Sequence, residues 1–264
     1  MKIKKINLSK LNQLYKHPSA YFFRAVELTT TYLNFNKIVF KHPSVDLGCG
    51  DGAVANLVFD ENFTYGVDNN EANDVKKSIM SGRYQKVLIE SAENLSLKSH
   101  SVNFVYSNCV IEHIPNNDKV LSEVSRILRD DGLFLFTVPS HMFPEYLYLT
   151  NKFLSFGLSF FSKMYKYRRN KMLNHFHCYS IDDWNDRLSR YSLKIINSKY
   201  YMSKRGLMLW DKMALKCFLF KLFGLNNEEK IFNKNFKMIN EIISEKNFSN
   251  PGAGIIILCR KYKK

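Results

Sequence analysis

The chain has 264 residues, of which 45% are hydrophobic and 24% charged, enough for one large domain with a full hydrophobic core. This composition excludes an intrinsically disordered chain and a small disulfide-stapled protein. Basic residues exceed acidic ones by 39 to 24, and 14% of the residues are aromatic. The net charge of +15 is uneven, with +7 in residues 1–44, −6 in residues 45–141 and +14 in residues 142–264. Such basic flanks predict contact with an anionic surface, either nucleic acid or lipid headgroups.

The cysteines and the apolar segments indicate where in the cell the protein is expected. Five scattered cysteines without a C-x-x-C pair support neither a disulfide framework nor a zinc site, and they favour a reducing cytosol. The basic start, Met1–Lys5, lacks the apolar run of a secretory signal. The most apolar uncharged stretch, Phe153–Ser162, is far shorter than the roughly 20 residues that span a bilayer. We therefore expect a cytoplasmic protein that is not integral to a membrane.

Hydrophobic periodicity predicts a helical start followed by alternating strands and helices. Residues 7–35 have apolar side chains at roughly helical spacing. Alternation of this kind, with apolar strands, predicts a parallel sheet covered by helices on both faces. The predicted strands are Ser44–Leu47, Thr64–Val67, Lys86–Ile89, Val102–Ser107 and Leu133–Val138, and the predicted helices are Ala53–Phe59, Glu71–Met80 and Asp118–Leu128, the last ended by Asp131-Gly132.

The pattern changes after Pro139. Residues 140–175 and 203–250 are rich in aromatic and basic side chains and are predicted to be insertions. Between them we expect a Ser-capped helix, Ser180–Arg190, and a strand, Ser192–Tyr200. A final strand, Gly254–Cys259, follows the turn at Asn250-Pro251-Gly252. The predicted organisation is a helical cap over residues 1–43 and one domain over residues 44–264.

The most informative stretch is the glycine-rich loop Val45-Asp46-Leu47-Gly48-Cys49-Gly50-Asp51-Gly52, between the first predicted strand and a helix. Glycines allow a tight turn and close approach of a ligand, and the helix amides favour an anionic group. A turn without any ligand and a dinucleotide fingerprint (Gly48–Ala53) both fit this loop. Asp68, at the end of the next strand, suits two ribose hydroxyls but would also fit NAD. Asp46 favours a ligand with an ammonium and a sulfonium over a pyrophosphate.

From the loop onward the sequence resembles the class I S-adenosylmethionine-dependent methyltransferases, in their branch that acts on small molecules, lipids and sugars. The resemblance covers Val45–Val138, with a weaker echo over His175–Tyr200. It implies a Rossmann-like, seven-stranded, mostly parallel sheet with an antiparallel last strand, N-terminal helices and two helical insertions. Besides the glycine loop, it depends on the order and spacing of Glu90–Leu95, Ser101–Ser107, Val110–Ile114 and Leu128–Leu133.

The resemblance also implies the residues that bind the cofactor, S-adenosylmethionine. Asp46 would lie near its ammonium and Asp68 would hold its ribose. The family commonly has Asp where Ser91 stands, so the adenine contact is altered, although Ser91 can still accept a hydrogen bond. The full predicted set is Asp46, Gly48, Cys49, Gly50, Gly52, Asp68, Asn69, Ser91, Ala92, Glu93, Asn108 and Cys109.

Methyl transfer to a hydroxyl also requires a group that accepts its proton. The candidates are His113, His141, His175 and His177, each of which could instead be a structural hydrogen-bonding histidine. His113 is predicted to pack with Glu112. A metal site built from His175 and His177 is not expected, because no acidic residue lies nearby in the sequence.

The two insertions do not identify the molecule that accepts the methyl group. Apolar aromatic segments next to cations suit lids over a pocket, a membrane interface or, less well, nucleic acid. The favoured function is O-methylation of a sugar hydroxyl on a surface-polysaccharide or lipid-linked glycan precursor, on an anionic membrane surface. The alternatives are a quinone or lipid-headgroup methyltransferase, an RNA methyltransferase and a non-catalytic scaffold that binds S-adenosylmethionine.

Overall fold

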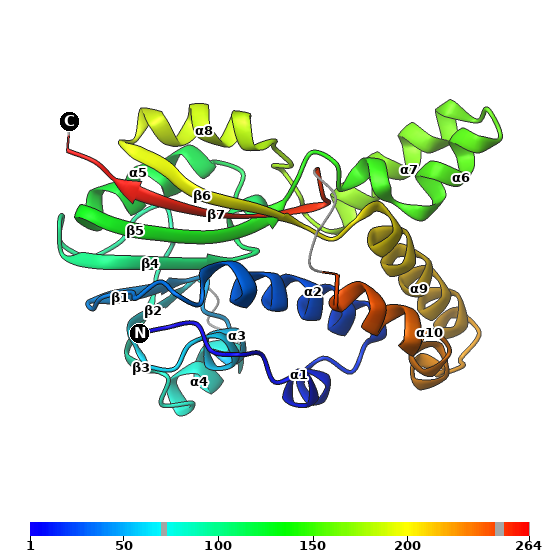
Figure 1. Ribbon diagram of the computed structural model, residues 1–264, viewed down its shortest axis with the longest axis horizontal. Helices are drawn as coiled ribbons and strands as arrows, with labels where there is room; N and C mark the ends of the chain where they lie inside the picture. The colour runs from blue at the N-terminus through cyan, green and yellow to red at the C-terminus, as the bar shows by residue number, and fades with distance from the viewer. Residues whose placement is uncertain (70–72, 246–250, 264) are drawn as a thin grey trace.

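The computed structural model describes residues 1–69, 73–245 and 251–263, and the side chains of residues 73–75 are not described. One sheet has the strand order β3-β2-β1-β4-β5-β7-β6 (Figure 1). The prediction of seven strands, mostly parallel with an antiparallel last strand, is confirmed. Five strands are mutually parallel, β1 (Ser44–Leu47), β2 (Phe63–Asp68), β3 (Tyr84–Ile89), β4 (Val102–Asn108) and β5 (Leu128–Pro139), and β7 (Gly254–Lys261) runs antiparallel to both β5 and β6 (Leu193–Tyr201).

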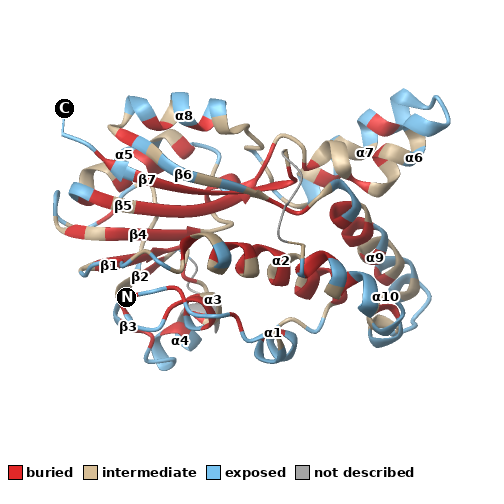
Figure 2. Ribbon diagram, viewed as in Figure 1, coloured by how far each residue is buried: buried red, intermediate tan, exposed pale blue. Residues whose placement is uncertain are grey.

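Helices cover both faces of the sheet, and successive side chains of a strand serve opposite faces. On β4, Phe104 and Tyr106 belong to one hydrophobic core and Val105 to the other. The first core includes side chains of α2 (Pro18–Phe35) and α3 (Ala53–Val58). The second includes those of α5 (Asn117–Ile127) and α8 (Ile181–Arg190) (Figures 1 and 2).

The predicted N-terminal helix is interrupted. Residues 7–35 form two helices, α1 (Leu8–Leu14) and α2, because Pro18 lacks an amide hydrogen and is accommodated only in the first turn of a new helix. Both helices lie against the face that α3 covers, and α4 (Asn73–Met80) packs beside β3. Residues 71–72 of the predicted helix Glu71–Met80 lie outside the described residues.

The prediction that Asp131-Gly132 ends the helix before β5 is wrong. α5 stops at Ile127, and Leu128 already pairs with Val102 of β4. Asp131 has a positive φ of 63°, and the pairing resumes only at Leu133 opposite Phe104. Asp131-Gly132 therefore forms an irregularity inside β5, where the left-handed residue lets extra residues protrude without ending the strand.

The helices of the two predicted insertions gather beyond the carboxyl ends of the parallel strands (Figure 1). Exposed residues cluster on the outer part of the pair formed by α6 (Tyr148–Ser155) and α7 (Ser159–Met172) (Figure 2). Within the described residues, no helix has both the length and the apolar character needed to cross a membrane. Residues 246–250 of the second insertion lie outside the described part. The first insertion contains the short helix η2 (Pro144–Tyr146) together with α6 and α7, and the second contains α9 (Lys204–Leu222) and α10 (Glu228–Ile243). A further short helix, η1 (Ile111–His113), follows β4 outside the insertions.

Candidate active site

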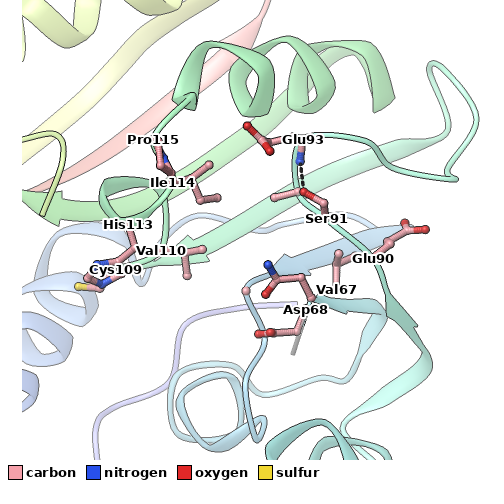
Figure 3. A pocket seen from close by; sticks show the side chains of 13 residues that line it. Val67, Asp68, Glu90, Ser91, Glu93, Cys109, Val110, His113, Ile114 and Pro115 are labelled. Carbon is pink, nitrogen blue, oxygen red and sulfur yellow. Dashed lines mark hydrogen bonds between the residues drawn. The ribbon is translucent and has the colours of Figure 1, made fainter. Parts of the chain in front are cut away.

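A first cavity of about 340 Å³ opens at the carboxyl ends of β1, β2, β3 and β4. This is where ligands bind in open α/β sheets, because the loops there diverge to helices on opposite faces. In Figure 3, Asp68 and Val67 lie on one side of this cavity, opposite Val110 and Ile114. The lining residues are Gly48, Val67, Asp68, Asn69, Glu90, Ser91, Ala92, Glu93, Cys109, Val110, His113, Ile114 and Pro115.

Gly48 shapes the wall of the first cavity. Its φ of +77° is left-handed, and a Cβ added there would lie 2.3 Å from Cγ2 of Val110. The backbone of the loop and the side chain of Val110 can therefore approach closely only with glycine at position 48.

Asp68 links the loop to the second strand. Its Oδ2 accepts a hydrogen bond of 2.9 Å from the amide of Gly50, and the same side chain lines the cavity. A carboxylate held by a backbone amide has a fixed orientation, which suits it to accept hydrogen bonds from a ligand's hydroxyls.

Asp46 lies behind the loop. It is 4% exposed and accepts a hydrogen bond of 2.5 Å from the hydroxyl of Tyr84 on β3. Burial raises the pKa of Asp46 to about 7, against the opposing effects of the Tyr84 hydrogen bond and of Arg83. The carboxylate is thus costly to ionise here without a cationic partner.

A second cavity of about 270 Å³ shares Cys109 and His113 with the first. Cys109 has a left-handed backbone (φ 51°), an uncommon conformation for a side chain of this kind that places it at the junction of the two cavities. The second cavity has an aromatic and apolar wall with a few charged groups, and it is lined by Tyr15, Ala20, Phe23, Arg24, Cys109, Glu112, His113, Pro139, Phe143, Leu173, His175 and Trp210.

A buried hydrogen-bond network lies beneath this junction. Glu27 on α2 is 0% exposed and accepts hydrogen bonds from Arg24 (2.7 Å) and from the Asn108 amide (2.7 Å). Asn108 also accepts from Arg24 and donates to Thr137 on β5. Because every amide group of Asn108 is engaged, the network fixes the end of β4 against α2 and β5.

Glu112, His113 and His175 form a cluster in the second cavity. Their ligand-type atoms all lie within 4.8 Å of one another. Burial raises the pKa of Glu112 to about 8. Burial, with His113 and Arg169 nearby, lowers the pKa of His175 to about 4, so its imidazole is neutral at neutral pH.

Comparison with known proteins defines the central region. Residues 45–136 match the model of a family described as a methyltransferase domain. These residues run from β1 through most of β5 and include every residue that lines the first cavity. They form a class I methyltransferase domain.

Two proteins of known name are similar to part of this chain. A Mycolicibacterium smegmatis protein named as an S-adenosylmethionine-dependent methyltransferase is 33% identical over 101 residues, covering 37% of this chain and 38% of that protein. The Mus musculus arsenite methyltransferase is 29% identical over 110 residues, covering 35% and 29%. The chain thus spans about a third of the length of these relatives. The fold is also that of a Galdieria sulphuraria protein named as a sarcosine dimethylglycine methyltransferase (TM-score 0.58, 16% identity, 92% of this chain and 86% of that one).

The cofactor of class I methyltransferase domains is S-adenosylmethionine, and the first cavity fits it. Asp68 has a fixed carboxylate of the kind that can accept hydrogen bonds from ribose hydroxyls, and Ser91 and Ala92 line the same cavity. Gly48 lets the loop pass close to Val110 at the wall of the cavity, where a Cβ would clash with that side chain. Of the twelve predicted cofactor residues, those that line the cavity are Gly48, Asp68, Asn69, Ser91, Ala92, Glu93 and Cys109.

The other five predicted cofactor residues do not line this cavity but lie close to it. Asp46 is held by Tyr84, and Asn108 is engaged in the Glu27 network. Cys49 is buried, with its Sγ 3.7 Å from the hydroxyl of Ser78. Gly50 and Gly52 carry the left-handed turns of the loop, and Gly52 caps α3.

The four candidate histidines separate into two groups. His113 and His175 line the second cavity. His177 bonds to the carbonyls of Ile114 and Pro115 and to the Tyr179 hydroxyl, and it does not line either cavity. His141 does not line them either, and its ring Nδ1 is buried without a hydrogen-bond partner.

Several lining residues are absent from the prediction. Val110, Ile114 and Pro115 border the first cavity, and they follow β4 at the edge where carboxyl ends of strands meet. That position is the signal that could have identified them. Arg24, which lines the second cavity, and Glu27, which pairs with it, carry no such signal, because α2 reaches the site only through tertiary packing.

Proposed function

We propose that this chain is an S-adenosylmethionine-dependent methyltransferase that O-methylates a sugar hydroxyl on a surface-polysaccharide or lipid-linked glycan precursor. The observation that carries the proposal is that the two cavities meet at Cys109 and His113. An acceptor in the second cavity would then lie beside a cofactor in the first, as direct transfer requires.

The reaction needs alignment more than chemical activation. The acceptor oxygen would form its bond to the methyl carbon as the methyl–sulfur bond breaks, the sulfur would leave as a neutral thioether, and the hydroxyl would lose its proton. When bound, S-adenosylmethionine supplies a methyl group already activated by the sulfonium. Alignment alone accounts for roughly 7–11 kcal/mol in favourable cases, so rigid walls such as the Glu27 network are the main requirement.

The second cavity supports a sugar as the acceptor. Phe23, Phe143 and Trp210 give it apolar faces, on which the C–H face of a sugar ring can pack. Arg24 and Glu112 offer hydrogen-bond partners for hydroxyl groups. We assign loss of the hydroxyl proton to the site formed by Glu112, His113 and His175, which lies in the same cavity.

A lipid-linked acceptor is supported by the α6–α7 pair. Phe156 and Phe160 are each 70% exposed, and Tyr167 is 68% exposed. Fewer cations are available there than the sequence suggests, because Lys166 pairs with Glu145 and Arg169 with Asp211. Lys163, Arg168 and Lys171 remain exposed on α7. Exposed rings beside cations suit an anionic membrane surface.

The first test is cofactor binding. S-adenosylhomocysteine should bind to the wild type in isothermal titration calorimetry, and Asp68→Ala should abolish binding by removing both the ribose acceptor and the bond to Gly50. Asp130→Asn, an exposed carboxylate that lines neither cavity, is the matched control. Equal affinity of Asp68→Ala and wild type would contradict the assignment of the first cavity.

The second test identifies the acceptor. Label from methyl-labelled S-adenosylmethionine should enter glycan or glycolipid fractions of a cell extract. Label in quinone or headgroup lipids, or in RNA, would overturn the sugar proposal in favour of those acceptors. Cofactor binding with no transfer to any fraction would indicate a non-catalytic scaffold.

The membrane component has its own test. Anionic vesicles (phosphatidylglycerol with phosphatidylcholine) should co-sediment the wild type, and the double variant Phe156→Ser/Phe160→Ser should lose this binding. Met80→Ser removes a side chain that is 85% exposed on α4 and serves as the control. Absence of wild-type binding at moderate salt would indicate that the insertions are lids only.

A further inference from the structure

We propose that Glu112, His113 and His175 form a binding site for one divalent transition-metal ion, such as Zn²⁺, in the second cavity. The inference rests on the proposed function only for its catalytic consequence, because the site itself is built from side chains in this chain. One carboxylate and two imidazoles are an established ligand set for such ions.

The geometry brings three ligand atoms from two distant segments together. Oε1 of Glu112 lies 3.9 Å from Nε2 of His113, and the rings of His113 and His175 have centroids 5.5 Å apart. All three ligand atoms lie within 4.8 Å of one another. Ligands of a tetrahedral ion at about 2.1 Å are roughly 3.4 Å apart, so a bound ion requires closure by about 1 Å. The His175 ring is positioned for this by edge-to-face contact with Phe143.

The hydrogen bonds of the cluster leave coordinating atoms open. Nδ1 of His113 lies 3.1 Å from the carbonyl of Asn174, to which it can donate. This second bond is typical of metal-binding histidines, because it fixes the tautomer that leaves Nε2 with its lone pair. Nε2 is the atom that faces Glu112.

The burial of Glu112 is a second, independent observation that favours a cation site. Its side chain is 1% exposed, and its Oε2 is buried without a hydrogen-bond partner. His175 likewise has a buried Nδ1 without a partner. Buried polar atoms are rarely left unsatisfied, and a cation between these groups would satisfy the carboxylate.

A metal ion here would explain how the acceptor loses its proton. Three protein ligands leave a fourth position open to an acceptor hydroxyl. Coordination lowers the pKa of a bound hydroxyl, as it does for water, so the hydroxyl would release its proton to solvent near neutral pH. The same bond would hold the oxygen at the junction of the two cavities.

The test uses the full-length protein, stripped with a chelator and titrated with Zn²⁺, and with Co²⁺ for its visible spectrum. One ion should bind per chain, and Co²⁺ should show the absorption of a tetrahedral site. Glu112→Gln and His175→Leu should each weaken binding at least tenfold, because even the loss of a residue that only supports a metal ligand costs about 10–100-fold in affinity. His100→Asn, which removes a 59% exposed histidine outside the cluster, should leave it unchanged.

Two results would overturn the inference, namely failure of the wild type to bind either ion, or equal binding by Glu112→Gln. S-adenosylhomocysteine affinity, measured on the same samples, reports whether each variant is folded. It also separates the two proposals, since loss of metal binding with intact cofactor binding contradicts only the metal site. Should Glu112→Gln fail to fold, His175→Leu provides the same comparison.

Discussion

Val110 packs directly over Gly48, so that a Cβ on this glycine would lie 2.3 Å from one Val110 methyl and 2.7 Å from the other. Gly48→Ala should therefore lower the free energy of unfolding by about 2–5 kcal/mol, from left-handed strain together with overpacking. It should also reduce S-adenosylhomocysteine affinity, because either Val110 or the loop must move into the first cavity. Urea unfolding and isothermal titration calorimetry measure the two effects.

The same loop contains a matched control. Gly50 also has a positive φ, but a Cβ there would meet nothing within 4 Å. Gly50→Ala should thus cost only about 1–2 kcal/mol. Gly48→Ala/Val110→Ala removes both obstructing methyls and should recover part of the lost stability. Equal effects of the two glycine substitutions would show that the contact with Val110 is unimportant.

A second prediction concerns Glu27, the centre of the buried network. Glu27→Ala leaves Arg24 without its ion-pair partner and removes an acceptor from Asn108. Breaking a buried pair in this way should cost about 3–5 kcal/mol in urea unfolding. Glu27→Gln keeps the shape and one acceptor, so it should cost less.

A double-mutant cycle isolates the pair. Arg24→Ala/Glu27→Ala should be destabilised by less than the sum of the single variants, with a coupling energy of about 0.5–3 kcal/mol. Additive losses would mean that the two side chains act independently, despite their separation of 2.7 Å.

The sequence was sufficient for the sheet and for the position of the first cavity. Apolar runs such as Val102–Ser107 have few alternatives to a buried parallel strand, and the carboxyl ends of such strands meet at one edge. It was insufficient at the helix before β5, where Asp131-Gly132 favours both a helix end and an irregularity in a strand. Pairing with β4 decided between them, and pairing is a tertiary property.

The second cavity shows the same limit more clearly. Nothing in the spacing of the histidines indicates that His175 lies beside His113 and Glu112 rather than acting with His177, its neighbour in sequence. The backbone after α7 places His175 beside His113, because the amide of Phe176 donates to the carbonyl of Glu112 and the carbonyl of Asn174 bonds to the His113 ring. Contacts across about 60 residues arise from packing and leave no local pattern.

A third prediction concerns the attachment of α7 to α9. Asp211 is 0% exposed, pairs with Arg169 at 3.1 Å and accepts a hydrogen bond from Tyr165 at 2.9 Å. Arg169 also lies over the ring of Trp210, which lines the second cavity. Asp211→Ala should therefore loosen α7 and raise KM for the acceptor severalfold, while leaving S-adenosylhomocysteine affinity unchanged.

Lys166→Ala tests whether this effect is specific to Asp211. It breaks the ion pair with Glu145, which also attaches α7. Because both side chains are partly exposed, the free energy of unfolding should fall by at most about 1 kcal/mol. A weaker affinity for S-adenosylhomocysteine in Asp211→Ala would show instead that the damage extends to the first cavity.

The last prediction is a pH dependence that originates at Asp46. Burial raises the pKa of this carboxyl from 3.8 to about 7, so the native state binds its proton more tightly than the unfolded chain does. The resulting stabilisation is complete below about pH 4 and is lost as the pH rises through about 7.

Asp46→Asn does not titrate and keeps an acceptor for the Tyr84 hydroxyl. The free energy of unfolding of this variant should therefore rise relative to wild type between pH 4 and 7, by at most about 1.4 kcal/mol per pH unit, and the difference should then level off. Urea unfolding across pH 5–8 measures this difference, and Asp186→Asn, which changes an exposed carboxylate on α8, should run parallel to wild type. Parallel curves for Asp46→Asn and wild type would show that Asp46 is already ionised in the folded chain.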